Sequence, residues 1–150
     1  MLHGNFFSQF FPVSMLEQGQ VHTYKFSFTQ ADVEAFARIS GDTNPLHLDA
    51  GYAAKTVFRR PIMHGFLGAS VFSKVMGTQF PGEGSIYLKQ SMEFVQPMFT
   101  DVAYEAVFTV MEILPKSSAR IETRIVELES GKTVTIGEAT VMNRQLIPKQ

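Results

Sequence analysis

The fold is decided by the stretch His64-Gly65-Phe66-Leu67-Gly68-Ala69-Ser70-Val71-Phe72-Ser73-Lys74-Val75-Met76-Gly77. Its apolar residues fall on most sides of a helix, and Lys74 is the one charged residue within it. A helix that is apolar nearly all round is a buried helix. Gly65, Gly68 and Ala69 are small, so another group can approach the first turns closely. The stretch therefore predicts a buried helix over residues 64–77.

The residues before this helix predict a strand and further helices. Residues 20–28 alternate between apolar and polar side chains, which indicates a strand. Thr29 is a typical N-cap, with Asp32 in the first turn, and the helix that follows ends at Gly41. A short helix is predicted over residues 49–55.

The residues after the central helix predict an antiparallel meander. A turn at 81–84 is followed by three or four strands, over 85–96, 102–113, 118–128 and 133–142. A hairpin turn is expected at 129–132. The order of strand, helices, buried helix and meander predicts an α+β fold, with a sheet curled around one central helix.

Composition restricts the classes of function. The chain has 150 residues, enough for one domain with a substantial core. Its net charge of -1 argues against a nucleic acid or anionic membrane recognised by bulk charge. No run reaches the roughly 18 apolar residues of a membrane span. The Phe-rich N-terminus lacks a basic n-region and a clear cleavage site, so we expect a cytoplasmic protein.

The content of cysteine and histidine restricts the chemistry further. The chain has no cysteine, which excludes disulfides, thiolate metal ligands and a cysteine nucleophile. The four histidines, His3, His22, His47 and His64, lack close ligand spacing, so we expect no metal site.

The loop Ser40-Gly41-Asp42-Thr43-Asn44-Pro45-Leu46-His47 carries the strongest signal of chemistry. A carboxylate and an imidazole are the groups most used to move protons near neutral pH. Simpler interpretations exist for each residue. Asn44 and Pro45 are a common helix start, Asp42 can brace a turn, and His47 can be a hydrogen-bonded core histidine. His64 is interpreted as a cap of the central helix.

Three separated blocks of the sequence resemble the (R)-specific enoyl-CoA hydratases, which are the MaoC-like dehydratase group. The blocks are Ser40–His47, Arg60–Gly65 and Pro81–Tyr87, in the order of that family. The arrangement also looks like the hot-dog fold, an antiparallel sheet wrapped around a long central helix. The resemblance implies a single domain over residues 16–146, with residues 1–15 as an N-terminal extension.

The resemblance implies reversible syn hydration of trans-2-enoyl-CoA to (3R)-3-hydroxyacyl-CoA, a lyase reaction of fatty-acid metabolism without a cofactor. The family's catalytic pair falls on Asp42 and His47, with Asn44 beside them. The group that binds the thioester oxygen falls on the backbone amide of Gly65. Ser73 falls where the family has a hydroxyl that supports the catalytic aspartate.

Two further residues are candidates for substrate binding. Arg60, next to Arg59, has the guanidinium that suits the phosphates of coenzyme A, although a solvated surface pair is an equal interpretation. Met76 is a candidate for the lining of an acyl tunnel, although methionine is more often part of the core.

Other functions are compatible with the same fold. They are dehydration of substrates bound to a carrier protein, acyl-CoA thioesterase activity, and acyl-CoA binding without catalysis. The presence of both Asp42 and His47 favours the hydratase. A sheet wrapped around one helix leaves an open edge, so we expect a homodimer or a higher homo-oligomer.

Overall fold

The computed structural model describes residues 14–150, so most of the predicted N-terminal extension lies outside the described part. The elements are β1 (Val21–Phe26), α1 (Gln30–Ser40), α2 (Pro45–Leu48), α3 (Ala50–Ala53), α4 (Gly65–Thr78), β2 (Ile86–Phe94), β3 (Tyr104–Leu114), β4 (Ser118–Glu127) and β5 (Thr133–Met142). The predicted α+β class is confirmed. Within residues 14–150, none of the helices combines the length and the apolar character that crossing a bilayer requires.

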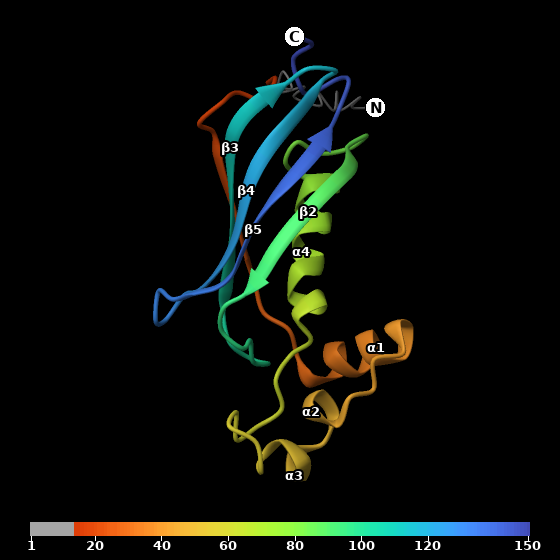
Figure 1. Cartoon of the computed structure of the whole chain (residues 1–150), viewed down its shortest axis with the longest axis vertical. Coiled ribbons are helices and arrows are strands. Elements are labelled where there is room, and N and C mark those ends of the chain that lie inside the picture. The colour runs from red at the N-terminus through yellow and green to blue at the C-terminus, as the bar shows by residue number, and fades with distance from the viewer. Residues whose placement is uncertain (1–13) are drawn as a thin grey trace, which may run out of the picture.

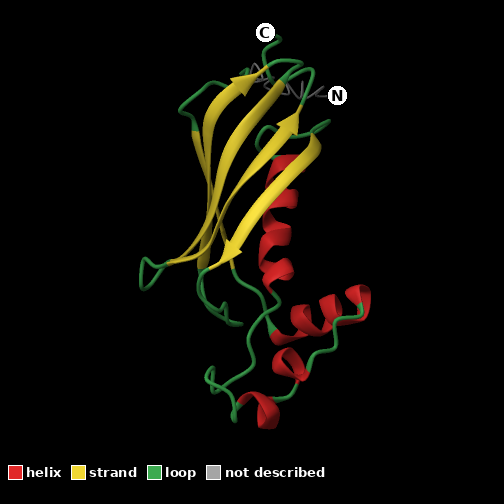
Figure 2. Cartoon of the chain, in the orientation of Figure 1, coloured by secondary structure: helices red, strands yellow, loops and turns green. Residues whose placement is uncertain are grey.

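The strands form one antiparallel sheet with the order β1-β3-β4-β5-β2 (Figure 2). β3, β4 and β5 are consecutive in the chain and occupy the middle of the sheet. β2 precedes them in sequence but pairs with β5, so β1 and β2 are the two edges. The predicted meander is thus confirmed for β3, β4 and β5. β2, the first of the four predicted strands, instead lies at the edge beside β5.

α4 packs lengthwise against one face of the sheet, which curves around it (Figure 1). Its buried side chains, among them Phe72, Val75 and Met76, join residues of the sheet such as Phe108 and Ile121 in one core. The prediction that α4 is buried on nearly all sides is wrong in one respect, because one stripe of the helix is exposed. The stripe consists of Phe66, Ser70, Ser73, Lys74, Gly77 and Thr78.

The helices α1, α2 and α3 lie beyond the end of the sheet, next to the first turn of α4 (Figure 1). α1 begins as predicted, with a capping box between Thr29 and Asp32, and ends at Gly41 with a φ of 79°. The predicted short helix over 49–55 is shorter, as α3. The preceding residues 45–48 form α2 because Asn44 caps it and Pro45 occupies its first position.

Two backbone hydrogen bonds hold the segment between α3 and α4 in place. The N–H of Ile62 donates to the carbonyl of Leu46 at 3.2 Å, and the N–H of Met63 donates to that of Met98 at 2.8 Å. The first bond ties this segment to α2, and the second ties it to the loop between β2 and β3. The N-terminus of α4 is thereby fixed beside α2.

Candidate active site

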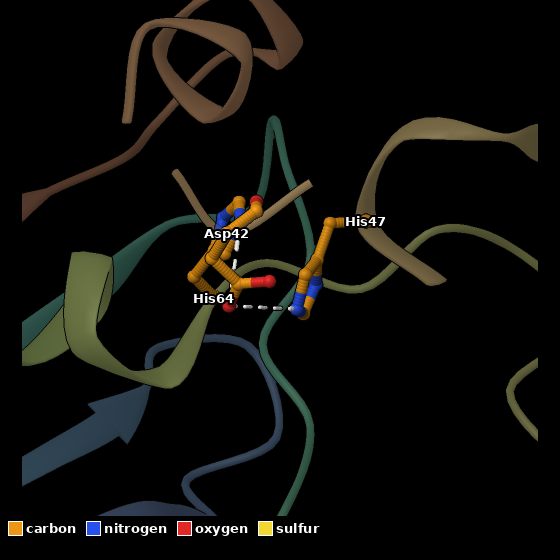
Figure 3. Close-up of side chains that lie close together, drawn as sticks. All are labelled: Asp42, His47 and His64. Atoms are coloured by element: carbon orange, nitrogen blue, oxygen red, sulfur yellow. Dashed lines mark hydrogen bonds and ion pairs between the residues drawn. The ribbon is translucent and has the colours of Figure 1, made fainter. Parts of the chain in front are cut away.

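Three side chains from separate parts of the chain meet at the N-terminus of α4 (Figure 3). Asp42 comes from the loop after α1, His47 from α2, and His64 from the residue before α4. The Oδ2 atom of Asp42 lies 3.9 Å from Nε2 of His47 and 3.9 Å from Nε2 of His64. The structure therefore brings the predicted pair together and adds a second histidine.

The loop holds the backbone of Asp42 on its N-terminal side and leaves its carboxylate accessible. The N–H of Asp42 donates to Oγ of Ser40 at 3.1 Å, and the N–H of Asn44 donates to Oδ1 of Asp42 at 3.2 Å. The side chain of Asp42 is 51% exposed. Its Oδ2 atom accepts no hydrogen bond from the described residues, so it is free to bind water or substrate.

His47 is 8% exposed, and its tautomer follows from its contacts. Its Nδ1 atom lies 2.8 Å from the carbonyl oxygen of Ile62. A carbonyl oxygen only accepts, so Nδ1 carries the proton in neutral His47 and Nε2 presents a lone pair. The 3.9 Å between this Nε2 and Oδ2 of Asp42 is too long for a direct hydrogen bond. It is short enough for one water to bond to both atoms.

His64 occupies the N-cap position of α4, but its side chain makes no capping hydrogen bond. Its predicted position as the cap of the central helix is confirmed, but only its backbone carbonyl caps the helix, and the ring turns toward the loop after α1. Its Nε2 atom lies 2.9 Å from the backbone carbonyl oxygen of Asp42. Sequence reasoning missed this contact, for which the only signal was the pair His64-Gly65 at the start of the helix.

Gly65 and His47 line one cavity of about 380 Å³. The other lining residues are mostly apolar and include Phe66, Phe94 and Met98. The first N–H groups of a helix have no intrahelical acceptor, and no residue within 14–150 accepts a hydrogen bond from the N–H of Gly65. An added Cβ at Gly65 would lie 2.7 Å from the ring of Phe94, so a side chain at this position requires that ring to move.

Asn44 lies beside the pair as predicted, but its carboxamide oxygen accepts from the N–H of Leu46 at 3.0 Å and caps α2. The structure thus shows the capping interaction directly. A catalytic role of Asn44 stays a prediction.

Ser73, Met76 and Arg60 do not join this group. Ser73 is eight residues beyond Gly65, or about 12 Å along α4 at 1.5 Å per residue, and lines a separate cavity with Tyr87. No hydrogen bond joins Ser73 to Asp42 among residues 14–150, so a supporting role of Ser73 stays a prediction. Met76 is 1% exposed in the core and does not line the cavity beside His47.

Arg60 is exposed on the surface near the end of the sheet. Its guanidinium lies 3.9 Å from the centre of the Phe99 ring. This cation–π contact holds the stem of the side chain, and it leaves the N–H groups at the edge of the guanidinium free for an anion.

A larger cavity of about 840 Å³ lies at the other end of α4 and contains Glu83 and Arg144. None of the predicted site residues lines it, so we assign the site by its chemistry and not by volume.

The group Asp42, His47 and His64 also has the residue types of a metal site, with one donor atom of each within 4.8 Å of the others. The hydrogen bond of His64 argues against this use. Because its Nε2 atom faces a carbonyl oxygen, it carries the proton and offers no lone pair there. The arrangement favours proton transfer, and the expectation of no metal stays a prediction.

Comparison with known proteins gives the family. A profile of the MaoC like domain matches residues 13–136. An (R)-specific enoyl-CoA hydratase from Aeromonas caviae is 46% identical over 128 residues, which cover 84% of this chain and 94% of the hydratase. Another from Rhodospirillum rubrum is 38% identical over 127 residues, covering 85% and 88% of the two chains.

A solved structure agrees with these similarities. The unliganded R-hydratase from Pseudomonas aeruginosa matches this structure with a TM-score of 0.80 and 39% identity, covering 90% of this chain and 84% of the hydratase. The similarity confirms the hot-dog fold predicted from the sequence. The chain therefore belongs to the family of MaoC-like dehydratases.

Proposed function

We propose that this protein is an (R)-specific enoyl-CoA hydratase, which adds water to trans-2-enoyl-CoA to form (3R)-3-hydroxyacyl-CoA. One observation carries the proposal. Because Nδ1 of His47 faces the carbonyl of Ile62, the Nε2 atom of the neutral ring presents a lone pair 3.9 Å from Oδ2 of Asp42, and His47 lines the same cavity as Gly65. A base and an oxyanion donor thus line one cavity, and an anchor for water lies beside the base.

The geometry supports a single-water mechanism. A water bound between Oδ2 of Asp42 and Nε2 of His47 loses a proton to His47 as its oxygen bonds to C3 of the substrate. The electron pair of the C2=C3 bond moves toward the thioester oxygen, which becomes an enolate. The same proton then passes from His47 to C2. Because one group serves both transfers, hydrogen and hydroxyl add to the same face of the double bond.

Gly65 supplies the stabilisation of the enolate in this mechanism. Its N–H is at the positive end of a helix of 14 residues, where negative charge is favoured. The absence of a side chain lets the thioester lie against the backbone. The apolar lining from Phe66, Phe94 and Met98 accommodates the neighbouring acyl carbons. Arg60 is placed on the surface, where its free N–H groups can bind a phosphate of coenzyme A.

We also propose that the protein is a homodimer. β2 is an open edge of the sheet, and Ile86, Leu88 and Phe94 on it are about half exposed. Phe66 on the exposed stripe of α4 is 66% exposed. A second copy that pairs along β2 covers this apolar surface and adds to the wall of the cavity beside His47.

The test is hydration of crotonyl-CoA and longer trans-2-enoyl-CoAs, followed as loss of absorbance at the enoyl-thioester band, with chiral analysis of the product. We expect the (3R) product alone. A thiol-release assay separates hydration from thioesterase activity, and enoyl thioesters of a carrier protein test the dehydratase alternative. Binding of the thioesters without any turnover would contradict the proposal and leave an acyl-CoA-binding module.

A further inference from the structure

We infer that His64 is a positioning residue of the active site, which holds the main chain of Asp42 in place and transfers no proton itself. The inference rests on the proposed function for its kinetic test. It depends on three observations: the hydrogen bond of His64, the burial of its ring and the residues that enclose it.

The hydrogen bond from His64 holds the Asp42 backbone at its carbonyl, on the C-terminal side of the Cα. Ser40 already accepts from the N–H of Asp42 at 3.1 Å. The Nε2–H of His64 donates to the carbonyl of the same residue at 2.9 Å. Asp42 is therefore held on both sides of its Cα, while its side chain is 51% exposed and its Oδ2 atom stays accessible. The contact to its carboxylate is 3.9 Å, too long for a hydrogen bond, so His64 acts on the backbone.

The other nitrogen of His64 indicates that the hydrogen bond to the Asp42 carbonyl is the reason for a histidine at this position. Its Nδ1 atom is buried and has no hydrogen-bond partner among residues 14–150. An unpartnered buried polar atom costs stability, and an apolar ring at this position would avoid that cost. The donor toward Asp42 is the feature that an apolar ring lacks. The same buried nitrogen has no hydrogen-bond partner through which a proton could pass to solvent.

The surroundings of His64 make the arrangement rigid. Its side chain is 2% exposed. One neighbour is the ring of Phe36 from α1, at 4.9 Å between centroids, and the other is the ring of His47 from α2, at 3.9 Å. His64 thus links α1, the Asp42 loop and α2 to the first residue of α4. A change at His64 is expected to alter the distance between Asp42 and His47.

A matched pair of variants separates the hydrogen bond from the packing. His64→Phe keeps a ring and removes the donor, whereas His64→Gln keeps an N–H donor near the position of Nε2. His22→Phe is the control, since His22 stacks on Phe80 and contacts Gln79 at the far end of α4. The readouts are kcat and KM for crotonyl-CoA, the melting temperature, and the tautomers of the histidines by ¹⁵N NMR.

We expect His64→Phe to lower kcat about 10- to 100-fold with little change in KM, because a misplaced group costs about this much. We expect His64→Gln to recover most of the loss, and His22→Phe to match the wild type. In the wild type, NMR is expected to show the proton of neutral His64 on Nε2 and that of neutral His47 on Nδ1.

Three results would overturn the inference. They are an unchanged kcat in folded His64→Phe, a His64→Gln variant as slow as His64→Phe, or a neutral His64 with its proton on Nδ1. The NMR result decides the inference even if the wild type hydrates none of the enoyl-CoAs. Failure of the proposed function is therefore distinguishable from failure of the role of His64.

Discussion

At the scale of single residues, the site depends on which nitrogen of each histidine carries the proton. Nδ1 of His47 faces the carbonyl of Ile62, and Nε2 of His64 faces the carbonyl of Asp42. The neutral forms of the two imidazoles therefore carry their protons on different nitrogens. Neutral His47 presents a lone pair near Asp42, as the proposed base requires, whereas His64 presents a hydrogen to the backbone carbonyl of Asp42.

Loss of either member of the catalytic pair is expected to abolish most hydration. Asp42→Asn and His47→Gln should each lower kcat by about 10²–10⁴-fold, the usual contribution of one acid–base group. Folding should be retained, as measured by circular dichroism and melting temperature. Asp49→Asn is the control, because asparagine also caps α3 through its side-chain oxygen. Near-full activity of Asp42→Asn or His47→Gln on every enoyl-CoA would refute the assignment.

A side chain at Gly65 is expected to block the thioester. Gly65→Val should lose substrate binding as well as turnover, measured as a rise in KM and a fall of about 10²–10³-fold in kcat. The clash with Phe94 needs its own control, since an added Cβ would lie 2.7 Å from that ring. The control is the double variant Gly65→Ala with Phe94→Ala, in which loss of the Phe94 ring relieves that clash. Recovery of wild-type activity in this double variant would show that packing, and not the oxyanion site, requires glycine.

At the scale of the elements, the pairing of β2 with β5 leaves no space for a side chain at Gly137. Met92 in β2 lies opposite Gly137 in β5. An added Cβ at Gly137 would lie 1.8 Å from the backbone oxygen of Ser91. A backbone atom cannot rotate away as a side chain does, so glycine at this position permits the pairing of the edge strand.

Gly137→Ala is therefore expected to destabilise the protein. Overpacking of this kind costs about 1–3 kcal/mol, and the free energy of unfolding in urea measures it. Gly77→Ala is the matched control, because an added Cβ there meets nothing within 4 Å. Within a helix that change is expected to stabilise by about 0.5–1 kcal/mol. Equal stability of the two variants would contradict the role of Gly137.

At the scale of the whole molecule, the proposed dimer follows from the apolar surface along β2 and α4. Leu88 is 48% exposed, and the register between β2 and β5 shifts at this residue, so it has no partner in the sheet. Leu88→Asp should leave the fold intact and weaken the dimer, since burying a leucine contributes about 1.5–3 kcal/mol.

Sedimentation velocity at micromolar concentration measures this effect. We expect the wild type and Ile39→Asp to sediment as dimers, since Ile39 is 86% exposed on α1, away from β2. Leu88→Asp is expected to shift toward the monomer. A wild-type monomer that still hydrates enoyl-CoA would show that the second copy is not required.

The sequence by itself determined the features that depend on local physics. The apolar pattern of residues 64–77 predicted the central helix, the cap at Thr29 and the glycine at 41 placed α1, and alternation placed the strands. The short spacing between Asp42 and His47 predicted that they act together, because five residues of chain keep them close. Each of these predictions depends only on residues that are close to one another in the sequence.

Only the tertiary structure decided the features that join distant residues. The contact between His64 and Asp42 spans 22 residues, and no local pattern specifies it. The separation of Ser73 from Asp42 and the exposed stripe on α4 depend on how the helix is placed against the curved sheet. The physical reason is that a helix specifies which side chains share a face, whereas packing against other elements decides what that face meets.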